Sequence, residues 1–385
     1  MIGIFKNYLN RLKILKGSIV IAFLTGILFS SHLWMVENRL FPLIKPLDDI
    51  TTLGYSSQLI LMLIFISLSI IWIFFENRWI GFIVLGTLIV VLLQDQLRWQ
   101  PWVYLYFLML LPYLLLNHRE ENHRSILGSL KFIISGVYIW SGIQKLNSNF
   151  VYSTFVKLLA HFDLKDGLEN WINIGYILPL IEIFIGLALL TSKFRIIGIF
   201  CAISMHVIIL VYLSPFVLNH NSVVYPWNVA MIIFVLLLFL GTNENLLTLV
   251  RMKQLNIWSV IPLVLVYVFP IFSYFGYWDH YLSFSLYSDK PSIYYIAIEQ
   301  TELHKVDKRL ENYFAEIPGL QGGQIIDINK WAYFELNVPF YPENRVFKKL
   351  SKKFCELGID EDKMIFLELY FHNREQLYNT FTCKK

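Results

Sequence analysis

The sequence predicts an all-α polytopic membrane bundle of about eight or nine spans over residues 1–280, followed by a small α+β domain over residues 281–385. Two observations lead to this division. Of the 385 residues, 56% are hydrophobic and 16% are charged, whereas an ordinary soluble domain has about 25% charged residues. The charges are also uneven, because 29 of the Lys, Arg, Asp and Glu residues fall within 281–385. We therefore expect a lipid-embedded part followed by a water-soluble part.

Long apolar runs, separated by short polar connectors, define the predicted spans. A span needs about 20 mostly apolar residues, and lipid offers no partner to free backbone groups, so each run must be helical. The run at 172–191 is the least regular, since it contains Pro179 and Glu182, and it is either a span or a tilted, re-entrant segment. The predicted spans are 14–36, 56–75, 79–97, 101–117, 126–144, 172–191, 195–214, 224–241 and 256–275.

The distribution of positive charge predicts the orientation. With nine spans, the stretches on the N-terminal side carry 11 Lys and Arg residues, and the opposite short loops carry 6. The positive-inside rule then places the N-terminus in the cytoplasm and the C-terminal domain outside it, in what we expect to be a bacterial inner membrane. If 172–191 does not cross, the domain moves to the cytoplasm.

The C-terminal part alternates between strand-like and helix-like patterns. Its predicted order βαββαβ is that of a ferredoxin-like unit, and we expect this domain to bind a partner or to gate the membrane part. The predicted elements are a strand at 293–299, a helix at 303–317, strands at 324–328 and 331–337, a helix at 343–357 and a strand at 364–371.

Charge and cysteine content exclude some functions. The net charge is +4 without a basic block, so nothing indicates nucleic-acid binding. The three cysteines show no zinc spacing, and we predict no metal. Cys355 and Cys383 in the domain either pair or stay free, and the oligomeric state is open.

Lys145 is the first candidate functional residue. Helical spacing places it on one face with Ser135, Tyr138 and Gly142, and small residues on such a face allow close helix packing. A lysine that points into the bundle can lose its proton and become a general base. The alternative is a lysine at the end of a span that snorkels to the interface.

Two more ionisable residues lie inside apolar runs, where charge is expensive. Glu182 should be protonated, exposed to water, or paired with a cation such as Lys145 or a histidine. His206, about eleven residues into its span, is either a base, a partner of Lys145 or a histidine satisfied within the bundle.

A polar and aromatic stretch between two spans forms the fourth candidate. It is either a well-capped loop or the lip of a site lined by aromatic rings. Its candidate substrate-binding or quinone-binding residues are His220, Tyr225, Trp227 and Asn228, to which we add Tyr138 and Glu182.

The segment 138–150, Tyr-Ile-Trp-Ser-Gly-Ile-Gln-Lys-Leu-Asn-Ser-Asn-Phe, resembles the signature of the vitamin K-dependent gamma-carboxylase-like membrane proteins. These are also called horizontally transferred transmembrane (HTTM) domain proteins. Further similarities follow in the same order along the chain, and Glu182 with Gly186 resembles the broader DoxX-like superfamily. The later similar positions are His206, Tyr225-Pro226-Trp227, Pro270, Trp278 and Phe284-Ser285.

This resemblance implies a lyase-like chemistry in which Lys145 deprotonates a reduced quinone of the vitamin K type, with His206 in the same site. It also implies a protein or peptide substrate on the extracytoplasmic side. Two departures weaken that implication, because Asn147 stands where the family often has an acid and Gln144 where the carboxylase has a second lysine. A quinone pocket is therefore favoured over peptide carboxylation.

Several functions stay open at this point. The first is a quinone-dependent membrane enzyme with Lys145 as its base. The second is a non-catalytic membrane protein that binds a lipid, a quinone or a partner protein. A DoxX-like redox partner lacks paired cysteines in the membrane, and a transporter lacks a visible inverted repeat.

Overall fold

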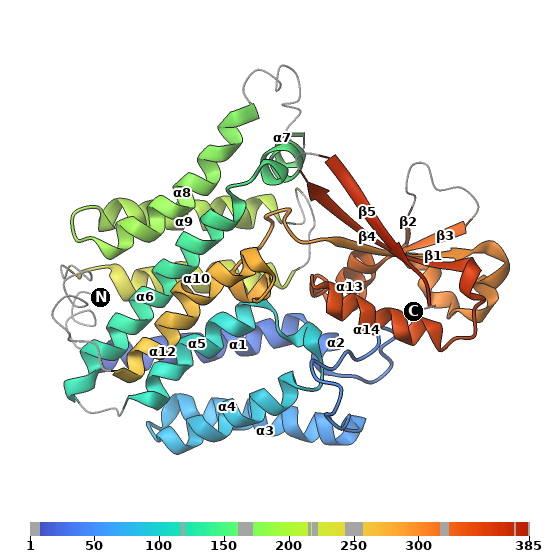
Figure 1. Cartoon of the computed structure of the whole chain (residues 1–385). Coiled ribbons are helices and arrows are strands. Elements are labelled where there is room, and N and C mark those ends of the chain that lie inside the picture. The colour runs from blue at the N-terminus through green and yellow to red at the C-terminus, as the bar shows by residue number, and fades with distance from the viewer. Residues whose placement is uncertain are drawn as a thin grey trace.

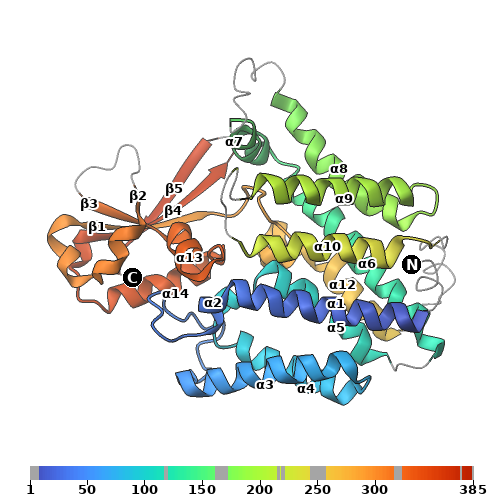
Figure 2. The same ribbon diagram turned by 180° about the vertical axis from the view of Figure 1, so that it is seen from behind.

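A computed structural model describes residues 8–116, 120–160, 172–214, 217, 222–242, 257–315, 323–372 and 375–383. Apolar helices lie roughly side by side and form the bundle (Figures 1 and 2), and a small α+β domain sits at one end of it. The helices of the bundle are α1 (Tyr8–Phe29), α3 (Tyr55–Phe74), α4 (Arg78–Leu92), α5 (Pro101–Leu115), α6 (Glu120–Lys145), α8 (Ile177–Leu190), α9 (Arg195–Tyr212), α10 (Val224–Phe239) and α12 (Ile257–Tyr267).

Every predicted apolar run overlaps one of these helices, but the number of spans is only partly established. Five helices of the described part are long and apolar enough to cross a membrane, namely α1, α3, α6, α9 and the segment Ile172–Leu190 that contains α8. The others are shorter, so the expected eight or nine spans are not confirmed. Short elements connect the helices: α2 (Ser31–Trp34), the 3-10 turns η2 (Gln96–Arg98), η5 (Ile172–Tyr176), η6 (Phe269–Phe275) and η7 (Tyr281–Ser283), the π-helix η3 (Phe150–Phe155) and α7 (Val156–Ala160).

The helix α6 is at the centre of the bundle. Its apolar window is 83% buried, against 28–50% for the other four long helices. It packs against α8, α12 and α5, and its C-terminal end faces the domain (Figure 1). Because lipid does not drive apolar helices together, close packing needs small residues. The residues of α6 are therefore the ones best placed to form a site shielded from lipid.

The C-terminal domain contains an antiparallel five-stranded sheet of order β2-β3-β1-β4-β5, with α13 and α14 on one side of it (Figure 1). A disulfide between Cys355 and Cys383 joins the end of α14 to the residues after β5. The elements are β1 (Ile293–Glu299), η8 (Gln300–Lys305), η9 (Lys308–Tyr313), β2 (Phe314–Ala315), β3 (Gly323–Asp327), α13 (Ile328–Leu336), α14 (Asn344–Cys355), η10 (Glu361–Lys363), β4 (Met364–His372) and β5 (Glu375–Phe381).

The domain differs from the predicted pattern in three places. The predicted strand at 331–337 is wrong, because this segment belongs to α13, which buries Trp331 and Leu336 and leaves Phe334 75% exposed. The predicted helix at 303–317 is replaced by 3-10 turns and β2, and the residues beyond 315 lie outside the described part. The strand β5 was not predicted. The ferredoxin-like assignment therefore stays a prediction.

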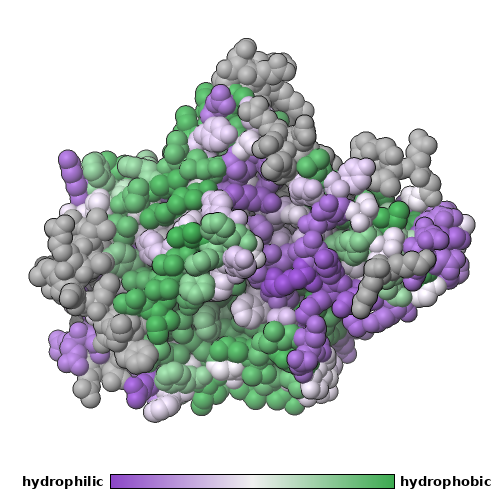
Figure 3. Space-filling model, in the orientation of Figure 1, coloured by the Kyte–Doolittle hydropathy of each residue, from purple (hydrophilic) through white to green (hydrophobic). Residues whose placement is uncertain are grey.

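Contacts with the first extramembrane loop fix the domain to the bundle. The Glu335 carboxylate in α13 accepts hydrogen bonds from the backbone N–H groups of Leu40 and Phe41. The Phe41 ring packs on Trp331 with 4.4 Å between ring centroids, and Asn337 Nδ2 donates to the carbonyl oxygen of Phe29 at 2.7 Å. Hydrophilic side chains gather at this junction and over the domain, while apolar ones cover the bundle (Figure 3).

Candidate functional site

Two glycines allow α6 and α8 to approach closely. A Cβ atom on Gly142 would lie 2.5 Å from the carbonyl oxygen of Pro179, and one on Gly186 would lie 2.6 Å from that of Ser135. Any larger residue would push the helices apart, since real Cβ atoms do not approach backbone oxygens so closely. The predicted small face of α6 is therefore its contact surface with α8, and it brings Lys145 against this helix.

Lys145 forms an ion pair with Glu182 at this contact. Its Nζ atom donates to the two carboxylate oxygens of Glu182 at 2.7 and 2.8 Å, and to Ser141 Oγ at 2.9 Å. The two charged side chains are only 11% and 12% exposed. An ammonium has three protons to donate, so all three are used. Glu182 is thus paired, as expected of a carboxylate within an apolar run.

A second polar chain crosses from α6 to α10. The Tyr138 hydroxyl lies 2.7 Å from His206 Nε2, and His206 Nδ1 lies 2.8 Å from Asn228 Oδ1. Asn228 Nδ2 donates to the carbonyl oxygen of Val224, which orients the amide so that Oδ1 faces the imidazole. Nδ1 then donates to this oxygen, and Nε2 shares its hydrogen bond with the Tyr138 hydroxyl. All three side chains are buried, and the two hydrogen bonds hold the imidazole in one orientation.

The ion pair and the hydrogen-bonded chain are neighbours. Tyr138, Ser141 and Lys145 are separated by three and four residues and so lie along one face of α6. The charges of Glu182 and Lys145 are close enough to act on the His206 imidazole. Residues of four helices therefore meet in one polar centre, which we define as Tyr138, Ser141, Lys145, Glu182, His206 and Asn228.

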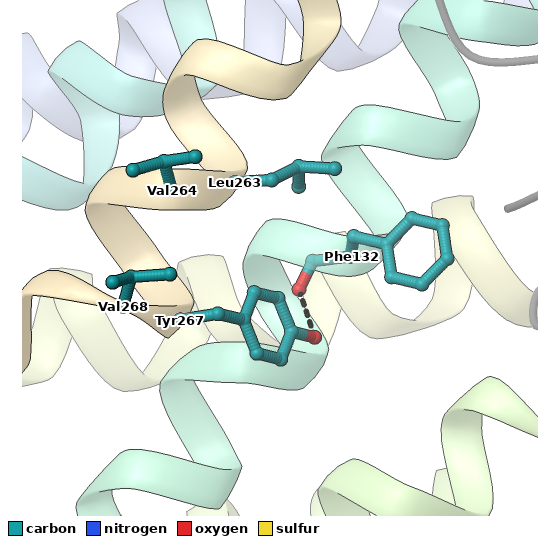
Figure 4. A pocket seen from close by; sticks show the side chains of 5 residues that line it. All are labelled: Phe132, Leu263, Val264, Tyr267 and Val268. Carbon is teal, nitrogen blue, oxygen red and sulfur yellow. Dashed lines mark hydrogen bonds between the residues drawn. The ribbon is translucent and has the colours of Figure 1, made fainter. Parts of the chain in front are cut away.

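This geometry does not supply a free lysine base. The Lys145 amine is already engaged by three acceptors, so it would first have to pass a proton to Glu182 or lose a partner. A pocket among the described residues lies elsewhere and is apolar. It has a volume of about 290 Å³ and is lined by Phe132, Leu263, Val264, Tyr267 and Val268, between α6 and α12 (Figure 4).

The predicted aromatic lip makes other contacts. The Tyr225 hydroxyl donates to the carbonyl oxygen of Leu213 at 2.8 Å, and the Trp227 ring packs near Tyr106 at 6.4 Å between centroids. Among the described residues of this stretch, only Asn228 hydrogen-bonds to another member of the polar centre, His206. His220 lies outside the described residues. The assignment of Tyr225, Trp227 and His220 to a binding site therefore stays a prediction.

Two polar residues near the end of α6 were not predicted from the sequence. Ser141 was passed over although it stands four residues before Lys145, a spacing that brings helical side chains together. Lys290 follows the membrane part, and its Nζ atom donates to Gln144 Oε1 at 2.8 Å. No local signal could have shown this contact, because the two residues are 146 positions apart.

Comparison with known proteins gives one family. Residues 123–224 match the model described as methylamine utilisation protein MauE, which is about a quarter of the chain. The matched segment contains the whole polar centre except Asn228. No curated protein and no solved structure matches.

This match overturns the resemblance to the vitamin K-dependent carboxylase or HTTM family and to the DoxX-like superfamily. The lysine motif and His206 both lie within the segment that the MauE model matches, and neither an HTTM nor a carboxylase model matches the chain. The geometry agrees, because Lys145 Nζ is engaged by Glu182 and Ser141 and is not the free base that the resemblance implied.

Proposed function

We propose that this multi-pass membrane protein binds a lipid-soluble quinone at the polar centre of α6, α8, α9 and α10. The observation that carries the proposal is the Lys145–Glu182 ion pair, which lies next to the buried His206 inside apolar helices. Ionisable residues in such helices are costly and mark functional sites by default. The small remaining exposure of the pair gives a ligand access to it.

Quinone chemistry suits these groups. A quinone carbonyl oxygen is an acceptor and can take the place of Ser141 Oγ on the Lys145 ammonium. A quinol hydroxyl is a donor and can bind a Glu182 oxygen. The proposal covers binding rather than turnover, because the Lys145 amine is already engaged by three acceptors. The family that matches residues 123–224 is named for methylamine utilisation. We infer from it only that this chain shares a membrane-embedded segment with that family.

The disulfide supports an extracytoplasmic domain in a bacterial inner membrane. Disulfides persist in oxidising compartments and are rare in the cytosol, and Cys355 is bonded to Cys383. This agrees with the excess of positive charge in the connectors on the N-terminal side. Under this proposal the polar centre opens toward the outer leaflet, since α6 ends at the face that carries the domain.

The test uses the full chain purified in detergent, with its unfolding temperature measured against a short-tailed benzoquinone. Decanol, which has a tail and no ring, is the ligand control. A hundredfold excess over Kd should stabilise the folded state by about 2.7 kcal/mol. The shift should vanish in Lys145→Met and Glu182→Gln. It should persist in Lys16→Met, which removes another buried lysine, one that donates to the carbonyl oxygen of Phe75.

Two outcomes would overturn the proposal. One is the absence of any shift with the quinone in the wild-type protein. The other is an equal shift with decanol. If the single variants do not fold, the double variant Lys145→Met/Glu182→Leu removes both charges together and should fold without binding the quinone.

A structural role for the same residues is the second candidate, and one observation favours it. All three protons of the Lys145 ammonium are used within the chain, and the His206 nitrogens are both paired. Such saturation is what helix-to-helix fastening requires. In that case the variants would lower the unfolding temperature, and no quinone would raise it.

A further inference from the structure

Lys290 is a half-buried cation at the edge of the bundle. Its Nζ atom donates to Gln144 Oε1 at 2.8 Å and lies 3.8 Å from the centroid of the Tyr274 ring. Within the described part of the chain, no carboxylate forms an ion pair with it. Burial lowers its pKa to about 8, and no charged neighbour contributes to that shift. Buried charges are normally paired, so this ammonium lacks the anion that its environment calls for.

The elements that hold Lys290 also line the apolar pocket. One is α6, which contributes Phe132 to the pocket and Gln144 to the lysine. The other is α12 with η6, which contributes Tyr267 to the pocket and Tyr274 to the lysine. The pocket is open and entirely apolar, apart from a Tyr267 hydroxyl turned inward to the carbonyl oxygen of Phe132 (Figure 4).

A hydrogen bond joins the two elements near Lys290. Gln144 Nε2 donates to Ser273 Oγ at 3.0 Å, which ties the end of α6 to η6. Beyond this link the surface becomes aromatic, with Tyr274 54% and Tyr277 82% exposed. Tyrosines prefer the boundary between lipid and water. The surface along α6 and α12–η6 therefore carries an apolar pocket and, at a membrane interface, a cation.

Its length fits one acyl chain. From Leu263 to Tyr274 the surface comprises about one turn of α-helix followed by a 3-10 helix, which together rise roughly 20 Å. An occupant of the pocket is hydrocarbon, because the pocket offers no polar lining. What selects one lipid over another must then be the headgroup, at the end where Lys290 lies.

We propose that the surface along α6 and α12–η6 binds a phospholipid with an anionic headgroup, whose phosphate accepts a hydrogen bond from Lys290 and whose acyl chain fills the pocket. The site is separate from the polar centre, because Lys145 faces α8 while Gln144 faces η6. The bound lipid then lies at the junction of bundle and domain, where it contacts the bundle and the linker that carries Lys290.

The test is native mass spectrometry of the full chain with phosphatidylglycerol and phosphatidylcholine of identical acyl chains. Wild-type protein should retain the anionic lipid preferentially. Lys290→Gln should weaken phosphatidylglycerol binding about tenfold, the size expected for one charge-assisted hydrogen bond, and leave phosphatidylcholine unchanged. Lys290→Arg should keep the preference. Val268→Trp, which fills the pocket, should reduce the binding of both lipids.

Lys193 provides the matched control. It also lies over an aromatic ring, at 5.3 Å from the Phe194 centroid, in the connector between α8 and α9. Lys193→Gln should leave the lipid preference intact. Equal retention of the two lipids by the wild type, or an unchanged preference in Lys290→Gln, would overturn the proposal. Displacement of the lipid by glycerol phosphate alone would overturn its acyl-chain part.

Discussion

Separating Lys145 from Glu182 should give two stability losses with opposite pH dependence. Removing one partner of a buried ion pair typically costs about 3–5 kcal/mol, because the other charge is left without compensation. The two side chains are 11% and 12% exposed and joined by two short hydrogen bonds, so this range applies to them. The orphaned charge can escape the penalty only by becoming neutral.

That escape sets an upper bound for each variant. Adding a proton to a glutamate carboxylate in water at pH 7 costs about 3.7 kcal/mol, and removing one from a lysine ammonium costs about 4.6 kcal/mol. In Lys145→Met the bound falls by about 1.4 kcal/mol for each pH unit of acidification, since protons become more available. In Glu182→Leu it falls by the same amount for each unit of alkalinisation. The first variant should therefore recover at acid pH and the second at alkaline pH.

The assay is unfolding of the detergent-solubilised chain at pH 5, 7 and 9, with the double variant Lys145→Met/Glu182→Leu completing the cycle. Singles at pH 7 should each lose about 3 kcal/mol, and the double variant should lose less than either, because a buried pair replaced by apolar residues is nearly neutral. Losses that are additive and flat with pH would mean that water solvates the pair, and the reasoning would fail.

Three further results are expected. Gly142→Val should separate α6 from α8 and cost about 1–3 kcal/mol of unfolding free energy. Gly86→Ala, in the open surface of α4, should stabilise the fold slightly. Similar effects of the two variants would contradict the packing argument. Cys355→Ser should lower the stability of the domain by about 3.6 kcal/mol, because the disulfide closes a loop of 28 residues, and limited proteolysis measures this loss. Cys383→Ser should cause the same loss. Unequal losses would mean that the two cysteines are not bonded to each other. The phosphatidylglycerol preference should be complete at pH 7 and decline as the pH rises past about 8, because Lys290, which faces Gln144 and Tyr274 and forms no ion pair within the described residues, then loses its proton. An unchanged preference at pH 10 would contradict this.

The sequence predicted the helices well because lipid leaves an apolar run no alternative to a helix. It also indicated why Glu182 needs a partner, and the small face of α6 identified the side on which Lys145 would find one. The choice among possible partners needed the fold, since Lys145 and Glu182 are 37 residues apart and meet only because Gly142 admits α8 so closely.

The errors have local causes. In 331–337 the aromatic and apolar residues mimic strand alternation, whereas the helix is fixed by its cap, in which the Asp327 side chain accepts from the backbone N–H of Lys330. The linker to the domain was unpredictable for another reason. Phe284, Tyr287 and Asp289 adopt left-handed backbone angles there, with φ of 57°, 51° and 51°, which side chains of these types rarely choose on their own.

The docking of Glu335 on Leu40 has a consequence for the order of assembly. These two residues are 295 positions apart, and a ribosome adds roughly 5–20 residues each second. The first extramembrane loop therefore waits roughly 15–60 s after its synthesis before its partner exists. During that time the backbone groups of the loop remain in water, and the bundle has to insert into the membrane before the C-terminal domain packs against it.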